Sequence, residues 1–353
     1  MIRLNRTVLE RLDPQTPDVD GICTTLQYAI ELEHATIPVY LYALYSLDAV
    51  RNPEIVKIIE SVVFEEMLHM TLAANVLNAL GGTPAIGHPG FIPDYPGPLP
   101  GGVESELTVS LRPFSMAQLG MFLDIEQPES PIVYKAGRDA LEAGKPVTIG
   151  QFYTAISVAL GQLGDGAFVR PARHQIGPDL MTNAVVVTDV ASAQRALAII
   201  IDQGEGTSTS PLEVTGGGYA HYYRFMQIQK QHFLLFDPHV GPGEKAYSYS
   251  GEPIAFDPAG VYPVPPDPSA AGYPAGSQQR ALCDRFNYTY TALLLALDAF
   301  LCGDNTGRQM DVAIGLMMSL KSQAKAMMSG IPDPGRYTGP SFEYQASDPA
   351  TAR

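Results

Sequence analysis

The stretch TLQYAIELEHATIPVYLYALY at residues 25–45, followed by IIESVVFEEMLHMTLAANVL at residues 58–77, decides the fold of this chain. In both stretches apolar residues recur every three or four positions, which is the spacing of a helix face packed on a core. Glu33 interrupts the apolar face of the first stretch, and Glu66 and His69 interrupt that of the second. Because an unpaired buried charge costs roughly several kcal/mol, we expect these groups to be paired or to bind a cation.

The two inward stripes are otherwise apolar. The first consists of Leu26, Ile30, Glu33, Ile37, Leu41 and Leu44, and the second of Ile55, Ile59, Val62, Glu66, His69, Ala73, Val76 and Leu80. The same helical geometry places Gln27, Glu31 and His34 on a more polar flank of the first helix. Glu33 is therefore the expected inward carboxylate of that helix.

Composition narrows the class of protein. With 353 residues, of which 46% are hydrophobic, the sequence predicts a packed globular protein. The formal net charge of -15 and the lack of a basic cluster argue against nucleic acid and anionic membranes as partners. The segment at residues 1–14 has no apolar signal core, and no long apolar run follows, so we expect a cytoplasmic protein without a membrane span. The three cysteines are too few and scattered for a disulfide framework.

The remaining helical patterns indicate an all-α protein. An antiparallel helical pair is expected from about residue 17 to 82, broken before Pro53. Further helices are predicted at residues 116–126, 149–163, 190–203, 219–236, 277–302 and 307–329. Long loops rich in proline and glycine occupy residues 83–115 and 237–276, and an alternating run at 106–112 predicts a short strand.

The ionisable residues match half of a known metal-site pattern. A four-helix bundle can hold two ions in its core when two helices each supply a Glu and the other two each supply a Glu-x-x-His. Glu33 and the pair Glu66 and His69 fit the first half, with the pair on one face of its helix. Oxygen-rich ligation with histidine suits iron or manganese, and open positions on such ions allow dioxygen chemistry.

The second half of the pattern is incomplete. In ASAQRALAIIIDQGEG, residues 191–206, one helical stripe consists of Gln194, Ala198, Ile201 and Glu205. It ends on the carboxylate of Glu205, and Asp202 lies one turn before it. His221, which shares a face with Phe225 and Ile228, is the expected nitrogen ligand of the next helix. The position three residues before it is Gly218, where the pattern would place a carboxylate.

Other interpretations of these residues stay open. Glu126, at the end of LGMFLDIEQP, is a lower-ranked replacement for the missing carboxylate, because a carboxylate in the turn before a proline is the simpler interpretation. Glu66 and His69 could also satisfy one another as a buried pair, with Glu205 as a solvent-facing helix end.

Several stretches together resemble one known family. ELEHATIPVYLYALYSL, FEEMLHMTLAANVLNALGG, IIIDQGEG and AHYYRF are similar to the ferritin-like domain associated with the imine-dimer (iminophenyl-pyruvate dimer) synthases of violacein- and rebeccamycin-type pathways. GEPIAFDPAGVYPV, FNYTYTALLLALDAF and GPSFEY also look like that family. The resemblance therefore runs from about residue 20 to 345.

The resemblance implies a ferritin-like four-helix bundle with a non-haem metal centre over residues 1–237, and a loop-rich segment with C-terminal helices packed on it over residues 238–353. It places the metal on Glu33, Glu66, His69, Glu205 and His221. Two iron ions are expected, with manganese as the alternative, and the departure at Gly218 leaves open whether one or two ions bind.

We therefore expect a metal-dependent oxidase or oxygenase of specialised metabolism that uses dioxygen and a small amino-acid-derived or aromatic substrate. Tyr40, two helical turns after Glu33, is the expected catalytic residue, because it could hydrogen-bond a ligand or quench a radical. The two long loops would cover the site. The alternatives are a metal-storage protein, or a scaffold of a biosynthetic complex that has lost the metal. A homo-oligomer or a partner enzyme is compatible with each.

Overall fold

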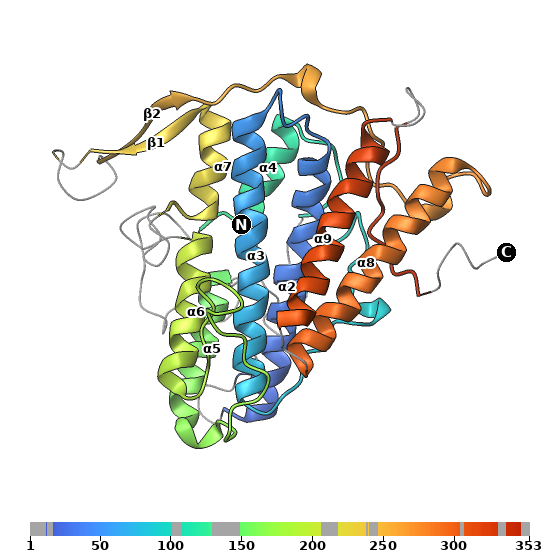
Figure 1. Ribbon diagram of the computed structural model, residues 1–353. Helices are drawn as coiled ribbons and strands as arrows, with labels where there is room; N and C mark the ends of the chain where they lie inside the picture. Colours follow the sequence, from blue (N-terminus) through green and yellow to red (C-terminus); the bar gives the residue numbers. More distant parts are fainter. Residues whose placement is uncertain are drawn as a thin grey trace.

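A computed structural model describes residue 12 and residues 17–100, 107–128, 149–205, 218–237, 239, 246–303, 307–330 and 337–346. Over these residues the chain is mainly helical, with one two-stranded sheet at the edge of the molecule (Figure 1). The predicted all-α class is confirmed. No helix among the described residues is long and apolar enough to cross a membrane.

Helices α2 (Val19–Tyr45) and α3 (Pro53–Ala79) lie side by side along their length and form the centre of the molecule (Figure 1). The carboxylate of Asp18 caps α2 by accepting a hydrogen bond from the Gly21 amide at 2.6 Å. Pro53 occupies the first turn of α3, where its missing N–H leaves no bond unmade. The helical pair predicted from the sequence is confirmed.

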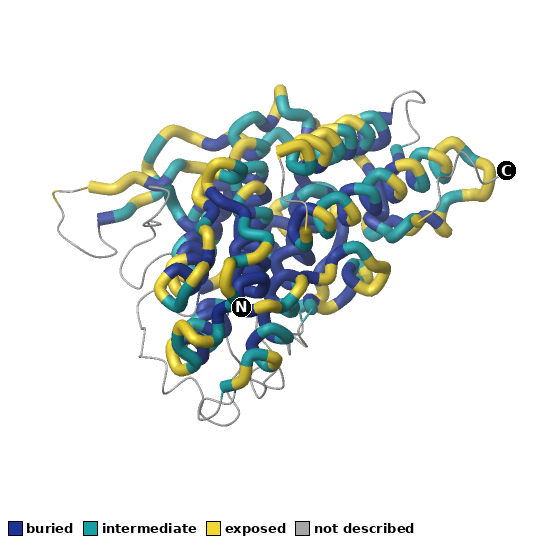
Figure 2. Tube along the Cα trace, turned by 60° about the horizontal axis from the view of Figure 1, so that its bottom comes forward, coloured by how far each residue is buried: buried dark blue, intermediate teal, exposed yellow. Residues whose placement is uncertain are grey.

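The rest of the bundle consists of four shorter helices. Helices α6 (Val190–Glu205) and α7 (His221–Lys230) both pack on α3, so together they follow its length. Helix α5 (Ile149–Leu163) packs on α2 and α6, and α4 (Met116–Ile125) packs on α7. The interior between these helices and the central pair is buried (Figure 2). Two short helices therefore stand where a simple bundle has one long helix.

Helices α8 (Gln278–Cys302) and α9 (Gly307–Met328) pack against a different side of the central pair (Figure 1). Their bounds agree with the sequence prediction. Short 3-10 helices occur in the connecting loops, at Pro89–Phe91, Asp165–Ala167, Pro258–Gly260 and Ala270–Gly272.

Two predicted elements were wrong. The helix expected over residues 219–236 ends at Lys230, because Gln231 adopts a left-handed conformation with φ of 57° and stops it. The next residues form strand β1 (His232–Phe236), paired antiparallel with β2 (Tyr247–Pro253). The strand predicted at 106–112 is, over its described residues, only an isolated bridge from Val109 to Gly97.

The sequence pattern placed His34 on the polar flank of α2, and this prediction was wrong. Its side chain is buried, its Nε2 lies 2.7 Å from the Tyr290 hydroxyl, and its ring packs on Phe91 with centroids 4.4 Å apart. The cause is tertiary, because helix α8 covers this face of α2 and the periodicity of α2 alone cannot show that. Gln27 and Glu31 do stay partly exposed and hydrogen-bond each other at 3.1 Å.

Candidate metal centre

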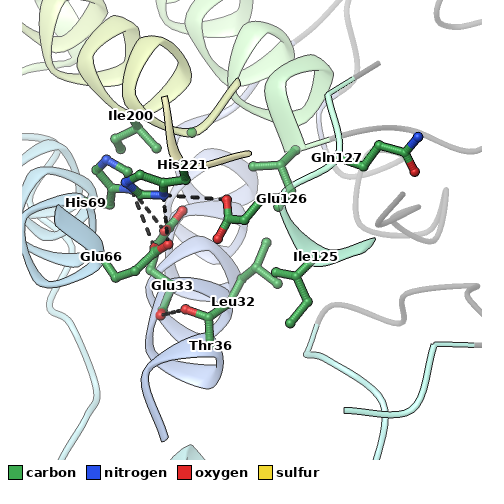
Figure 3. Close-up of a pocket in the computed structure, with 12 residues that line it drawn as sticks. Leu32, Glu33, Thr36, Glu66, His69, Ile125, Glu126, Gln127, Ile200 and His221 are labelled. Carbon is green, nitrogen blue, oxygen red and sulfur yellow. Dashed lines mark hydrogen bonds and ion pairs between the residues drawn. The ribbon is translucent and has the colours of Figure 1, made fainter. Parts of the chain in front are cut away.

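Five ionisable side chains from four helices meet inside the bundle (Figure 3). Glu33 comes from the middle of α2, and Glu66 and His69 come from one face of α3. Glu126 is the residue at the C-terminal end of α4, and His221 is the first residue of α7. All five are buried, with exposed fractions of 8% or less.

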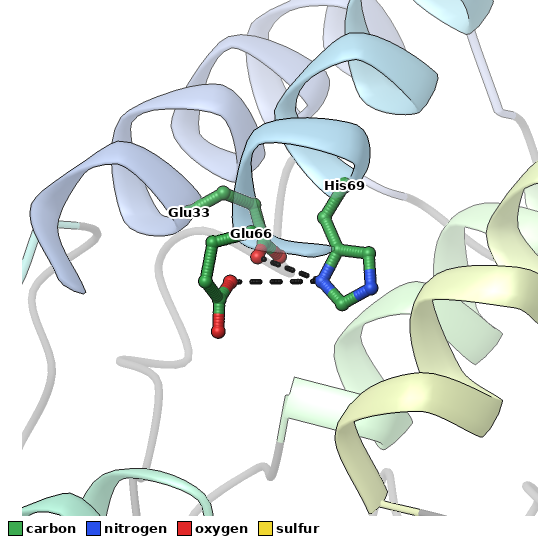
Figure 4. A group of neighbouring side chains, drawn as sticks. All are labelled: Glu33, Glu66 and His69. Carbon is green, nitrogen blue, oxygen red and sulfur yellow. Dashed lines mark ion pairs between the residues drawn. The ribbon is translucent and has the colours of Figure 1, made fainter. Parts of the chain in front are cut away.

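The five side chains form two groups that share Glu66. In the first, His69 Nδ1 lies 3.4 Å from Glu33 Oε2 and 3.6 Å from Glu66 Oε2 (Figure 4). In the second, His221 Nδ1 lies 3.2 Å from Glu66 Oε1 and 3.5 Å from Glu126 Oε2. Glu66 therefore turns one oxygen to each histidine, as a carboxylate that bridges two ions would.

This geometry fits a metal ion in each group. Ligand atoms about 2.1 Å from a common ion lie roughly 3.0–3.4 Å apart, close to the separations in the two groups. The Nδ1 atom of His221 is buried and makes no hydrogen bond to a described residue, although two carboxylates surround it. A nitrogen and oxygens that converge without bonding each other are arranged for a cation between them.

Each terminal carboxylate is also held by a tyrosine. The Tyr153 hydroxyl, from α5, donates to Glu33 Oε1. The Tyr40 hydroxyl, from α2, donates to Glu126 Oε1. Both tyrosines are completely buried. The carboxylates thus keep their Oε2 atoms turned toward the histidines.

The outer nitrogens of the two histidines are anchored differently. His69 Nε2 lies 3.0 Å from Gln203 Oε1, on α6. His221 Nε2 lies 2.9 Å from Glu65 Oε2, and the other oxygen of Glu65 accepts a 2.9 Å bond from Arg224. Such partners fix the ring orientation and leave Nδ1 free to bind an ion. One histidine is backed by a neutral amide and the other by a charged carboxylate.

The carboxylates of the cluster stabilise positive charge on their neighbours. Burial, with a contribution from Glu66, raises the pKa of Glu33 to about 7, although contact with His69 opposes the shift. Burial alone would lower the pKa of His69, but its contacts with Glu33 and Glu66 raise it to about 10. The pKa of His221 is likewise raised well above its usual value, because Glu126, Glu65 and Glu66 outweigh burial. Without a metal, the carboxylates therefore hold protons on the imidazoles, and a cation would displace them.

The space among these side chains is small. A cavity of about 30 Å³ lies beside the cluster, lined also by Leu32, Thr36, Ile125, Gln127, Ile149, Ile200 and Gly204. This volume holds one or two groups of the size of water. The space is therefore on the scale of metal ions and water-sized ligands.

The structure brings together four of the five predicted ligands, Glu33, Glu66, His69 and His221. It also brings in Glu126, the lower-ranked candidate for the missing carboxylate, which ends α4 and is buried 3.5 Å from His221 Nδ1. Its role as a metal ligand stays a prediction. Gly218 does not leave a gap, because α7 begins at His221 and the position three residues earlier precedes the helix.

The fifth predicted ligand, Glu205, ends α6, but its side chain lies outside the described residues, so its role stays a prediction. The stripe on which that prediction rested faces solvent at Gln194 and Ala198. The inward face of α6 instead carries Ala193, Ala196, Leu197, Ile200 and Gln203. Asp202 is partly exposed and belongs to neither ligand group among the described residues.

The sequence reasoning missed Tyr153, Glu65, Gln203 and Arg224. Tyr153 and Gln203 each lie on the buried face of their helix, so a polar group on an apolar stripe was the available signal. Glu65 and Arg224 gave no such signal, because adjacent charged residues on helices are usually solvated. Glu65 and Arg224 form an ion pair only because α7 packs against α3.

Comparison with known proteins identifies the family of this fold. A family model described as ferritin-like matches residues 26–230, which is more than half of the chain and includes both ligand groups. A ferritin-like protein of known structure from Caulobacter vibrioides is 24% identical, with a TM-score of 0.57, over 90% of this chain and 97% of that chain. At this identity the likeness supports the fold alone. None of the curated proteins compared with the chain matches it. The chain belongs to the ferritin-like family.

Proposed function

We propose that this protein is a non-haem metal enzyme, an oxidase or oxygenase that uses two iron ions and dioxygen. The observation that carries the proposal is Glu66, whose two oxygens face different histidines at 3.2 and 3.6 Å. A carboxylate shared in this way is the bridging ligand of two-metal bundle sites. Manganese is the alternative metal, because the same oxygen-rich donor set suits it.

Each residue of the cluster has a defined task in this proposal. Glu33 and His69 would hold one ion, Glu126 and His221 the other, and Glu66 both. When bound, the ions supply reduction of dioxygen and oxidation of an organic substrate. Tyr40, buried and bonded to Glu126, positions that carboxylate and is the side chain best placed to exchange a proton with it.

The substrate class in this proposal comes from the family resemblance of the sequence. The resemblance to domains associated with imine-dimer synthases supports a small amino-acid-derived or aromatic substrate, and a role in specialised metabolism beside a partner enzyme. The narrow space at the metal centre, about 30 Å³, is consistent with dioxygen entering the centre while a larger substrate binds at its edge.

The test is metal content followed by dioxygen consumption. We expect two iron ions per chain after anaerobic loading, and uptake of dioxygen by the reduced protein. Glu66→Ala should lose both ions because both groups share this residue, whereas Glu126→Ala should lose one. Glu31→Ala, on α2 but partly exposed and outside both groups, is the matched control and should keep both ions.

Two results would contradict the proposal. Full metal content in Glu66→Ala would show that the ligands are wrongly assigned. Two bound ions that consume no dioxygen in the presence of aromatic amino-acid derivatives would favour metal storage or a scaffold over an enzyme.

A further inference from the structure

A second cavity, of about 290 Å³, lies between the central helices α2 and α3 and the C-terminal helices α8 and α9. Its lining includes His34 of α2 and Met67 and Met70 of α3. These residues each follow a metal-site residue by one position, and one residue turns a helix by about 100°. The cavity therefore opens on a different face of the central pair and does not share the ligand residues of the metal centre.

The lining is almost entirely apolar. Leucine and isoleucine side chains make up much of it, and four methionines, Met67, Met70, Met317 and Met318, come from its two sides. Methionine is flexible and polarisable, and its sulfur packs favourably on aromatic rings. An apolar cavity of about 150 Å³ is large enough to stay dry and bind one benzene molecule. This cavity is about twice that size, so it has room for two such rings.

One hydroxyl group of the lining lacks a partner. Tyr45 lines the cavity, is 5% exposed, and hydrogen-bonds no described residue. A hydroxyl that bonds no protein group keeps its hydrogen-bonding capacity for a ligand. Among the other polar lining residues, His34 bonds Tyr290 through Nε2, and its Nδ1, which has no partner among the described residues, is fully buried. Lys321 pairs with Glu60 at 2.5 Å. Tyr45 therefore offers the polar contact for a bound molecule.

The cavity also has an apolar entrance. Phe64 of α3 and Ile314 and Met318 of α9 line it and are 61%, 47% and 59% exposed. Large apolar side chains at a cavity mouth help an apolar molecule leave water.

We propose that this cavity is a second binding site, for a small neutral molecule with two aromatic rings, or an apolar body of that size, and one hydrogen-bond acceptor such as a carbonyl. The methionines and leucines hold the apolar body, and the Tyr45 hydroxyl donates to the acceptor. The site is separate from the metal centre, and its existence does not depend on the function proposed above.

Benzophenone and diphenylmethane test this proposal, because both have two aromatic rings and only the first has a carbonyl. Titrated calorimetrically into the full-length protein, both should bind, with benzophenone tighter. Tyr45→Phe should weaken benzophenone about five-fold, which is the loss of one neutral hydrogen bond, and leave diphenylmethane unchanged. Equal effects of Tyr45→Phe on both ligands would overturn the assigned contact.

Filling the cavity tests its location. Leu297→Trp, in the lining on α8, should reduce the affinity of both ligands at least ten-fold. Leu295→Trp, two residues earlier, exposed and outside the lining, is the control and should bind normally. If Leu297→Trp does not fold, Ile314→Trp at the exposed mouth serves the same purpose. Metal content should stay at the wild-type value in every variant, which keeps this test apart from that of the metal centre.

Photolabelling gives an independent readout. On irradiation benzophenone attaches to nearby C–H bonds, so peptides containing Met67, Met70, Met317 or Met318 should carry the label. Labelling elsewhere would overturn the proposal. Failure to bind, together with a concentration-dependent dimer that Ile314→Trp disrupts, would also overturn it and show that a second copy of the chain covers the mouth.

Discussion

The unequal support behind the two histidines predicts that the two ions bind with different affinities. His221 is backed by the carboxylate of Glu65, whereas His69 is backed by the amide of Gln203. Burial raises the pKa of Glu65, but His221 and Arg224 together bring it below its ordinary value, so this carboxylate is charged. A charged partner makes the bound imidazole a stronger ligand. The ion beside His221 should therefore bind first.

Glu65→Gln removes this charge and keeps the shape. Hydrogen bonds to charged groups contribute about 1.5–3 kcal/mol and neutral ones about 0.5–1.5 kcal/mol, so the change should cost about 1–1.5 kcal/mol. This corresponds to roughly ten-fold weaker binding of the ion at Glu66, Glu126 and His221. The ion at Glu33, Glu66 and His69 should keep its affinity.

Calorimetric titration of metal-free protein with Mn²⁺ measures this difference. We expect two resolved binding steps in the wild-type protein, and a weaker first step in Glu65→Gln. Glu60→Gln is the matched control, because Glu60 lies on the same helix but pairs with Lys321 away from the metal centre. The reasoning is refuted if Glu65→Gln and the control give the same two affinities as the wild type.

Three other predictions follow from the described contacts. Each ion, at about 100 times its dissociation constant, should stabilise the protein by about 2.7 kcal/mol, so two ions should raise the Tm by roughly 7 °C, reversibly with a chelator. Calorimetry measures the Tm, and an unchanged value would contradict the buried site. Tyr153→Phe should destabilise the metal-free protein by about 1–2 kcal/mol, because Glu33 loses its buried hydrogen-bond donor, and two ions should still bind. Urea unfolding measures the stability and metal analysis the ions. Loss of metal would show that Tyr153 is needed for metal binding. Burial, with a smaller contribution from the charge of Asp298, raises the pKa of Cys302 to about 11. Alkylation of Cys302 by iodoacetamide should therefore be slow at pH 8 and become faster as the pH approaches 11, because the thiolate is the reactive form. Rapid modification at pH 8 would argue against this burial.

The central helices and their inward residues could be predicted because periodicity is a local property. Glu33, Glu66 and His69 lie on apolar stripes that the chain displays at fixed spacing, and burial follows wherever such a stripe packs. The weaker predictions came from short or interrupted elements. The α6 face was assigned wrongly because small residues occur all around that helix, and only packing against α3 and α5 selects the side that carries Gln203.

The sequence by itself determined that a helical pair would bury two carboxylates and a histidine, since those groups sit at core positions of strongly periodic helices. Only the tertiary structure decided which groups complete the site. Glu126 stands at a helix end, where no periodicity indicates the direction of its side chain. The face of His221 could be predicted, but its contacts with Glu66 and Glu126 arise because α7 packs on both α3 and α4. The contacts of His221 with Glu66 and Glu126 join residues 155 and 95 positions apart. They depend on how the helices pack in space, which the periodicity of any one helix does not show.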